Sequence, residues 1–418
     1  RIFRVHKKIS FDLLDRFSQN QNSFKNDEKE EIYKNTIIFW YDYLAKKKPD
    51  IFFSKLPPHQ FYDYIIYLCC KILKIKTICF FPTYFHPRIF LSDNINVRSK
   101  IFQNNKVTNF HKKTSVQFIK NSKAKIKSNY DNAVPYYIKK YKFVKKNYIK
   151  YFIYYAGKLI FNFFKESFFK KSSILDKTLN SNLKNISILR FNYLELKAAV
   201  KKYMLRNYYS SKSSNIEKKE KYLYFASAYQ PEYTNSPYGG NFFNQVETLK
   251  FIRRSIPDDI KIYYKEHPVI FNPNPLQSGH KNRNKNYYNQ LLKIKNLKLI
   301  EQNYNSFDLI DNSLLVATIS GETGIEAFFR KKPCIVFSNT WYSKLNGVFV
   351  IKSEENLKKN FEKIVNFKFF ENEDIFLEDF YNKSIDMLEV NDFSNDLSNK
   401  KIDELIEYFN YYIKIKKN

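Results

Sequence analysis

The chain has 418 residues, of which 44% are hydrophobic, so it can bury more than one core and is not a disordered polymer. It carries 72 Lys and Arg against 41 Asp and Glu, a formal charge of +31 that favours anionic partners. The lysines are spread along the chain, which favours phosphorylated substrates or an anionic membrane surface over nucleic acid.

The four cysteines have neither the spacing of a zinc ribbon nor that of a disulfide framework. They lie in apolar runs, so we expect buried, reduced thiols and a cytoplasmic compartment. No run of 18 uncharged apolar residues occurs, and we therefore expect no helix that spans a membrane.

The first hundred residues predict a βαβ unit. We expect a short strand at 1–5 and a helix at 28–46. Short apolar runs at 51–54 and 77–81 then predict buried strands, separated by a helix at 60–73. Strand, helix and strand at this spacing indicate a parallel sheet.

The next hundred residues are rich in Lys, Asn and aromatic residues and poor in turn residues. We expect helices here. Within 148–171, aromatic side chains are mixed with five lysines, which is typical either of a helix lying on an anionic bilayer or of an ordinary helix facing a core. The small polar run SSKSSNIEKKE at 210–220 predicts a linker.

After this linker, strands and helices alternate more clearly. The expected strands are 222–226, 260–264, 297–301, 314–318, 334–337 and 348–351. The expected helices are 241–255, 306–311, one ending at 329, 353–367 and a last one at 401–414.

The domain prediction follows from this pattern. It comprises an N-terminal Rossmann-like lobe, a basic helical region assigned to that lobe, a linker, a C-terminal nucleotide-binding lobe and a helical tail. Their boundaries are 1–105, 106–209, 210–220, 221–385 and 386–418.

In parallel α/β sheets, ligands bind at the carboxyl ends of strands. The first such end of interest is Gln230-Pro231-Glu232, after the strand at 222–226. The proline fixes the loop, and Glu232 is a candidate for acid–base work or for binding a substrate hydroxyl. A solvated loop carboxylate is the alternative.

The second strand end is Lys265-Glu266-His267-Pro268. A cation and an imidazole that leave a buried strand together suit a pyrophosphate, and a donor such as His267 would stabilise the charge on a leaving nucleotide. A structural histidine is the alternative, because His86-Pro87 also occurs in the first half.

The third strand end is the run TISGETGIEA at 318–327, a small-residue turn that leads into a helix. Free N–H groups at a helix start, with nearby hydroxyls, form an anion site, and a carboxylate one turn later suits the two hydroxyls of a ribose. A capped helix with nothing bound is the alternative. The candidate nucleotide-binding residues of this run are Ser320, Gly321, Glu322, Thr323 and Glu326.

No metal-ligand cluster, P-loop, G-x-G-x-x-G or G-x-S-x-G pattern occurs. This argues against a kinase-like NTPase, a dehydrogenase and an α/β-hydrolase. Among the six histidines, only His59 has an acid four residues on, Asp63.

Taken together, the three strand ends resemble those of capsular polysaccharide biosynthesis proteins, which are GT-B glycosyltransferases related to bacterial Kdo transferases. The resemblance covers 222–342 well and 49–93 loosely, and it does not cover 100–215.

The resemblance implies two Rossmann-like lobes that face each other across a cleft. It implies nucleotide binding by Gln230, Lys265, His267, Ser320 and Glu326, and catalytic roles for Glu232, His267 and, on the acceptor side, His59. The donor would be a CMP-activated acidic sugar, used without a metal or another cofactor. The acceptor would be a glycan or a lipid-linked glycan, and the enzyme would work in the cytoplasm, with peripheral contact to the inner membrane face.

Three alternatives remain open. A CDP-glycerol glycerophosphotransferase shares the Lys-x-His-Pro strand end but usually carries an Asp-Tyr-Ser-Ser-like run where this chain has Ser320-Gly321-Glu322-Thr323. A sugar-nucleotide 2-epimerase would need two carboxylates around one sugar ring. The non-enzymatic alternative is a basic protein that binds a membrane or nucleic acid.

Overall fold

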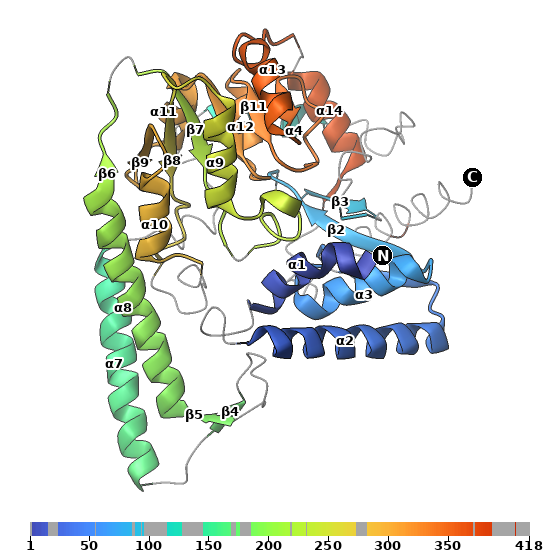
Figure 1. Cartoon of the computed structure of the whole chain (residues 1–418), viewed down its shortest axis with the longest axis vertical. Coiled ribbons are helices and arrows are strands. Elements are labelled where there is room, and N and C mark those ends of the chain that lie inside the picture. The colour runs from blue at the N-terminus through green and yellow to red at the C-terminus, as the bar shows by residue number, and fades with distance from the viewer. Residues whose placement is uncertain are drawn as a thin grey trace.

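The computed structural model describes residues 2–15, 24–54, 56–85, 88–92, 94–95, 115–127, 145–168, 173–175, 185–217, 220–230, 232–272, 282–370, 373–386 and 406. Two α/β lobes and a long hairpin of two helices are the main parts of the molecule (Figure 1).

The C-terminal lobe is built on a parallel sheet with the strand order β12-β11-β10-β7-β8-β9-β6. Its strands are β6 (Ser213–Ser214), β7 (Tyr222–Ala226), β8 (Lys261–Lys265), β9 (Leu297–Ile300), β10 (Leu315–Thr318), β11 (Cys334–Val336) and β12 (Val348–Val350). β7, β10 and β11 are buried along their whole length. Such strands read as short apolar runs because helices cover both faces of a parallel sheet.

The helices of this lobe begin at ordinary caps. The side chains of Asn244, Asn284, Asn305 and Ser353 each accept a backbone N–H at a helix start. The helices are α9 (Gln245–Ser255), α10 (Lys285–Leu292), α11 (Ser306–Asn312), α12 (Thr323–Phe329) and α13 (Glu354–Val365).

The N-terminal lobe has a smaller sheet with the order β1-β2-β3-β13. β1 (Ile51–Ser54) and β2 (Lys76–Pro82) are parallel and joined through α3 (Phe61–Ile72), as the sequence predicts. β3 (Arg88–Ser92) and β13 (Ile385–Asp386) are antiparallel to their neighbours, so this sheet is mixed.

The strand predicted at 1–5 is wrong, because these residues begin the helix α1 (Ile2–Asp15). Phe3 packs against the core together with Leu13 and Leu14 further along the helix. A five-residue window is too short to reveal this helical period. The second helix, α2 (Asn26–Lys47), confirms the prediction for 28–46.

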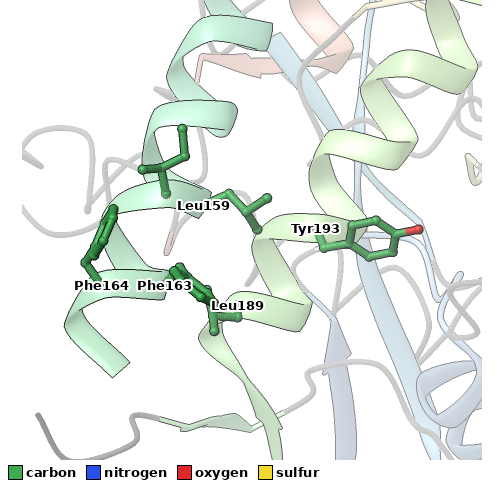
Figure 2. Close-up of a pocket in the computed structure, with 6 residues that line it drawn as sticks. Leu159, Phe163, Phe164, Leu189 and Tyr193 are labelled. Carbon is green, nitrogen blue, oxygen red and sulfur yellow. The ribbon is translucent and has the colours of Figure 1, made fainter. Parts of the chain in front are cut away.

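The basic middle region forms α4 (Ser115–Lys127) and a hairpin of α7 (Lys145–Phe168) and α8 (Ile188–Lys212), with a small sheet of β4 (Ser173–Leu175) and β5 (Asn185–Ser187). An apolar crevice lies between α7 and α8 (Figure 2). Although we expected this region in the N-terminal lobe, α8 contacts α10, and Leu205 and Tyr209 join the core of the C-terminal lobe.

α8 also continues into the predicted linker, and β6, directly after it, pairs with β9. The helix and the sheet are therefore directly connected. The small residues in 210–220 mark the end of a helix rather than a hinge between lobes.

The end of the C-terminal lobe returns to the N-terminal sheet. After α14 (Glu373–Lys383), β13 pairs with β3, and the guanidinium of Arg88 donates to Ser384 Oγ and to the carbonyl of Tyr381, both at 2.7 Å. One cluster of buried apolar side chains spans both lobes. Of the helix expected at 401–414, only Ile406 lies within the described residues.

The two-lobed α/β plan is thus confirmed. All four cysteine side chains are buried, as expected. Within the described ranges, no helix has the length and apolar character that a membrane crossing requires.

Candidate functional site

The loops that follow β7, β8 and β10 leave the same edge of the C-terminal sheet. Ala226 and Lys265 are register partners at the ends of β7 and β8, and Ala317 near the end of β10 pairs with Phe225. Because neighbouring parallel strands end together, the three polar segments predicted from the sequence lie along this edge.

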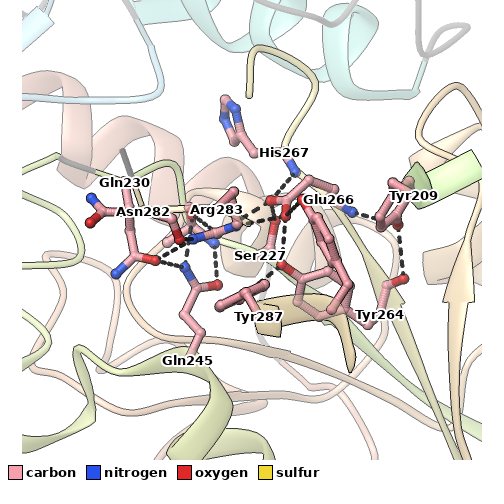
Figure 3. A network of polar contacts seen from close by, with 12 residues as sticks. Tyr209, Ser227, Gln230, Gln245, Tyr264, Glu266, His267, Asn282, Arg283 and Tyr287 are labelled. Atoms are coloured by element: carbon pink, nitrogen blue, oxygen red, sulfur yellow. Dashed lines mark hydrogen bonds and ion pairs between the residues drawn. The ribbon is translucent and has the colours of Figure 1, made fainter. Parts of the chain in front are cut away.

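His267 is the second residue beyond the buried end of β8. Its Nδ1 accepts the N–H of Val269 at 3.3 Å, which assigns the proton of the neutral ring to Nε2. Burial lowers the pKa of His267 to about 4. The side chain is therefore a neutral N–H donor at pH 7, and Figure 3 shows its ring directed away from the neighbouring polar network.

That network is centred on a fully buried ion pair between Glu266 and Arg283, with Nε 2.7 Å from Oε2. Burial alone would raise the pKa of Glu266, but the charge and hydrogen bonds of Arg283 hold it below its usual value. Further donors to this carboxylate, at 2.8 to 3.0 Å, are the hydroxyls of Ser227, Tyr264 and Tyr288 and the N–H of His267. Glu266 thus fixes the backbone from which the imidazole projects.

Gln230 belongs to the same network. Its Oε1 accepts from Arg283 Nη1 at 2.6 Å and from Gln245 Nε2 at 2.9 Å, and its Nε2 donates to the carbonyl of Phe243 at 3.1 Å (Figure 3). The sequence suggested nucleotide binding for Gln230. In the structure this side chain connects the loop after β7 to Arg283 and α9.

Sequence reasoning missed Arg283, because no motif surrounds it. The one available signal was Glu266 itself, since a carboxylate at the end of an apolar strand requires a buried cation or several donors.

Glu232 and Ser320 approach each other through Thr234. Thr234 Oγ1 donates to Glu232 Oε2 at 2.8 Å, and the buried Ser320 hydroxyl donates to the carbonyl of Thr234. Ser320 therefore joins the loop after β7 to the turn after β10. Pro231 lies outside the described residues.

The turn into α12 is held by close packing. The N–H of Gly321 donates to Thr318 Oγ1 at 3.1 Å, and the Tyr342 hydroxyl donates to the Gly321 carbonyl. A Cβ on Gly324 would lie 2.5 Å from the buried Tyr342 ring, so only glycine fits there. Glu322 and Thr323, at the start of α12, are partly exposed.

Glu326, one turn into α12, lies where the two lobes meet. Tyr84, from the loop after β2, donates to its Oε1 at 3.5 Å. Burial raises the pKa of Glu326 to about 7, although the charge of Lys265 and the bond from Tyr84 act in the opposite direction. Lys265 is buried and donates to Ser306 Oγ at the start of α11.

His59 brings the N-terminal lobe to the loop that carries Glu232. Its ring lies 5.8 Å, between centroids, from the ring of Tyr233. Nδ1 donates to the carbonyl of Pro57 at 2.7 Å. The candidate site thus includes one imidazole from each lobe, His267 and His59.

Among the described residues, no three His, Cys, Asp or Glu side chains gather in a way that would hold a metal ion. The polar groups described at this sheet edge are N–H donors, hydroxyls, a lysine and carboxylates. Such groups suit a phosphorylated, hydroxyl-rich ligand.

Residues 185–361 match the family model described as capsule polysaccharide biosynthesis protein. This match confirms the resemblance predicted from the three strand ends, all of which fall within it. None of the curated proteins compared with the chain matches it.

Two of the solved structures that match the chain are a transferase and an epimerase. A β-Kdo 2,7-transferase, KpsC of Thermosulfurimonas dismutans, is 15% identical, with a TM-score of 0.28, and the alignment covers 48% of this chain and 58% of that one. The UDP-GlcNAc 2-epimerase of Methanocaldococcus jannaschii is 18% identical, with a TM-score of 0.29, over 88% of this chain and 89% of that one.

Proposed function

We propose that this protein is a glycosyltransferase that moves a sugar from a nucleotide donor to a growing capsular polysaccharide or its lipid-linked primer. The observation that carries the proposal is the meeting of three strand-end loops at one sheet edge, within the segment that matches the capsule family model. A CMP-linked, Kdo-like sugar is the donor that the family resemblance favours.

The reaction would use the arrangement as follows. The bond between the anomeric carbon and the donor phosphate breaks, and a bond from an acceptor hydroxyl to that carbon forms. His267 Nε2–H donates to the phosphate oxygen that gains charge, and the α12 start binds the same phosphate. The acceptor proton passes to His59 or Glu232, where the two lobes meet.

Glu326 would receive the ribose hydroxyls of the nucleotide, next to Lys265. Protein donors replace a metal in this scheme, so we expect the reaction to continue in EDTA. We place the reaction at the inner face of the cytoplasmic membrane, where the acceptor would be assembled.

The first experiment is a thermal-shift screen of the full chain with CMP, CDP, UDP and GDP. A nucleotide at about 100 times its Kd adds roughly 2.7 kcal/mol to the free energy of unfolding. Nucleotide release from the matching sugar donor, with capsular oligosaccharide as acceptor, then measures turnover. Isomerisation of the donor without an acceptor, transfer of glycerol phosphate, or loss of activity in EDTA that Mg²⁺ restores would contradict the proposal.

The second experiment separates the two nitrogens of His267. The Asn of His267→Asn can still accept the N–H of Val269 but lacks the Nε2 donor, and we expect it to lower kcat about 100-fold. His267→Gln places an amide N–H near the Nε2 position and should lose less. Equal turnover of His267→Asn and the wild type would remove His267 from the mechanism.

A further inference from the structure

The outward side of α7 is apolar although nothing in the described structure covers it. The side that packs on α8 carries residues buried at seven-residue intervals, Tyr148, Tyr155 and Asn162. Away from these three residues, four residues at helical spacing are 52–63% exposed; they are Ile149, Ile153, Ile160 and Phe164. We call these four residues the outer stripe.

The outer stripe has apolar surroundings. Phe152, Phe161 and Phe163 on α7 and Tyr193 on α8 are also exposed by 43% or more. Near the far end of the hairpin, a crevice of about 680 Å³ opens beside the two helices and is lined entirely by aliphatic and aromatic residues, among them Ile160 and Phe164 of the outer stripe (Figure 2). Apolar area of this extent marks an interaction surface rather than scattered surface residues.

The positive charge of the hairpin favours an anionic partner over a second copy of the same hairpin. α7 and α8 together carry eleven Lys and Arg against two Glu. Lys150, Lys197 and Lys201 are exposed. A second copy of this hairpin would bring like charges together, whereas each lysine near an anionic lipid surface is attracted to it.

We propose that the hairpin docks on a bilayer that contains anionic lipids, with the outer stripe inserted at the boundary between headgroups and acyl chains. Ile149 and Phe164 are about 22 Å apart along the helix axis, so the contact is a line parallel to the membrane surface. Lysine side chains beside the stripe extend to the headgroups while their stems cover apolar surface. This inference goes beyond the proposed reaction and does not depend on it.

Co-sedimentation of the full chain with vesicles tests the proposal. We expect binding to phosphatidylcholine vesicles that contain phosphatidylglycerol, weaker binding without it, and loss at high salt. The variant Ile153→Ser/Phe164→Ser should lower the vesicle partition coefficient at least about tenfold. The matched control is Phe370→Ser/Ile375→Ser, which removes two residues that are 84% and 65% exposed on another part of the molecule and should bind as the wild type does.

A second pair of variants tests the charges without touching the stripe. Lys150→Glu/Lys201→Glu should abolish the preference for phosphatidylglycerol, while Lys358→Glu/Lys359→Glu on α13, with the same change in net charge, should keep most of it. Circular dichroism checks that each variant is folded.

Three results would overturn the proposal. The first is failure of the wild type to pellet with anionic vesicles at low salt. The second is an equal loss of binding by the variants on the hairpin and by their matched controls. The third is a dimer, seen by light scattering without lipid, that only the variant of the outer stripe dissociates, because the stripe would then contact a second copy.

Discussion

Burial shifts the pKa values of His267 and Glu326 in the directions that favour the uncharged form of each side chain. The pKa of the imidazole falls to about 4, and that of the carboxyl rises to about 7. His267 therefore stays neutral over the whole physiological range. Glu326, by contrast, changes charge within it, so the position that we propose for the ribose gains one negative charge as the pH rises through neutrality.

The shift of Glu326 predicts a dependence of stability on pH. The protonated carboxyl of Glu326 holds its proton more tightly in the folded protein than in the unfolded chain. The stabilisation that this adds is therefore fully present below about pH 4.5 and is lost as the pH rises through about 7. Relative to Glu326→Gln, the wild type should lose about 3 kcal/mol of unfolding free energy between pH 4.5 and 8. Urea unfolding at the two pH values measures this.

The control for that measurement is Glu362→Gln, an exposed residue of α13, which should leave the pH dependence of the wild type unchanged. Parallel stability curves for wild type and Glu326→Gln would show that the carboxyl ionises as it does in water.

At the scale of elements, the carboxylate of Glu266 holds the end of β8 in place. Glu266 receives donors from Arg283, from β8 itself, from α10 and from the loop after β7. A buried ion pair stabilises little against apolar replacement, but removal of one partner leaves the other charge unpaired in the interior. The elements around the candidate site are thus held in position by a carboxylate that is itself fully buried.

Glu266→Gln should therefore destabilise the fold by about 3 to 5 kcal/mol in urea unfolding, because Arg283 keeps its charge. Glu354→Gln, which breaks the surface pair with Arg254, is the matched control and should change little. A similar small effect of both substitutions would mean that water reaches Arg283.

Strand 222–226 could be predicted to the residue because buried parallel strands are short apolar runs between turn residues. The bounds of strand 51–54 are also correct, but its predicted burial is wrong, because β1 lies at the edge of its sheet with Ile51 and Phe53 exposed. The strand ends of the candidate site followed from the same signal. Arg283, the attachment of the hairpin and the return of β13 could not be predicted, because each depends on contacts between distant parts of the chain. The wrong strand at 1–5 arose where the first turn of a helix carries no acidic residue to signal a helix start.

At the scale of the whole molecule, the lobes share one apolar core. Phe85 and Phe90 of the N-terminal lobe contact Trp341 and Phe380, and Arg88 anchors the returning segment of β13. Unfolding of either lobe would therefore expose part of the apolar core of the other, so we expect the two lobes to unfold together. This coupling differs from that of two domains joined by a linker.

We predict one heat-absorption peak in calorimetry, with a calorimetric enthalpy close to the van't Hoff enthalpy. Arg88→Met, which removes buried charged hydrogen bonds, should lower the Tm of this single peak without splitting it. Two separated peaks for the wild type would contradict the shared core.

The hydroxyl of Tyr209 connects the helical hairpin to the candidate site. It accepts the N–H of Glu266 at 3.1 Å and donates to the carbonyl of Ile300 at 2.6 Å, so α8 is fastened to the strand end that carries His267. These two hydrogen bonds hold α8 in a fixed position relative to the C-terminal sheet. A membrane that bound the far end of the hairpin would therefore also fix the orientation of the candidate site relative to the bilayer.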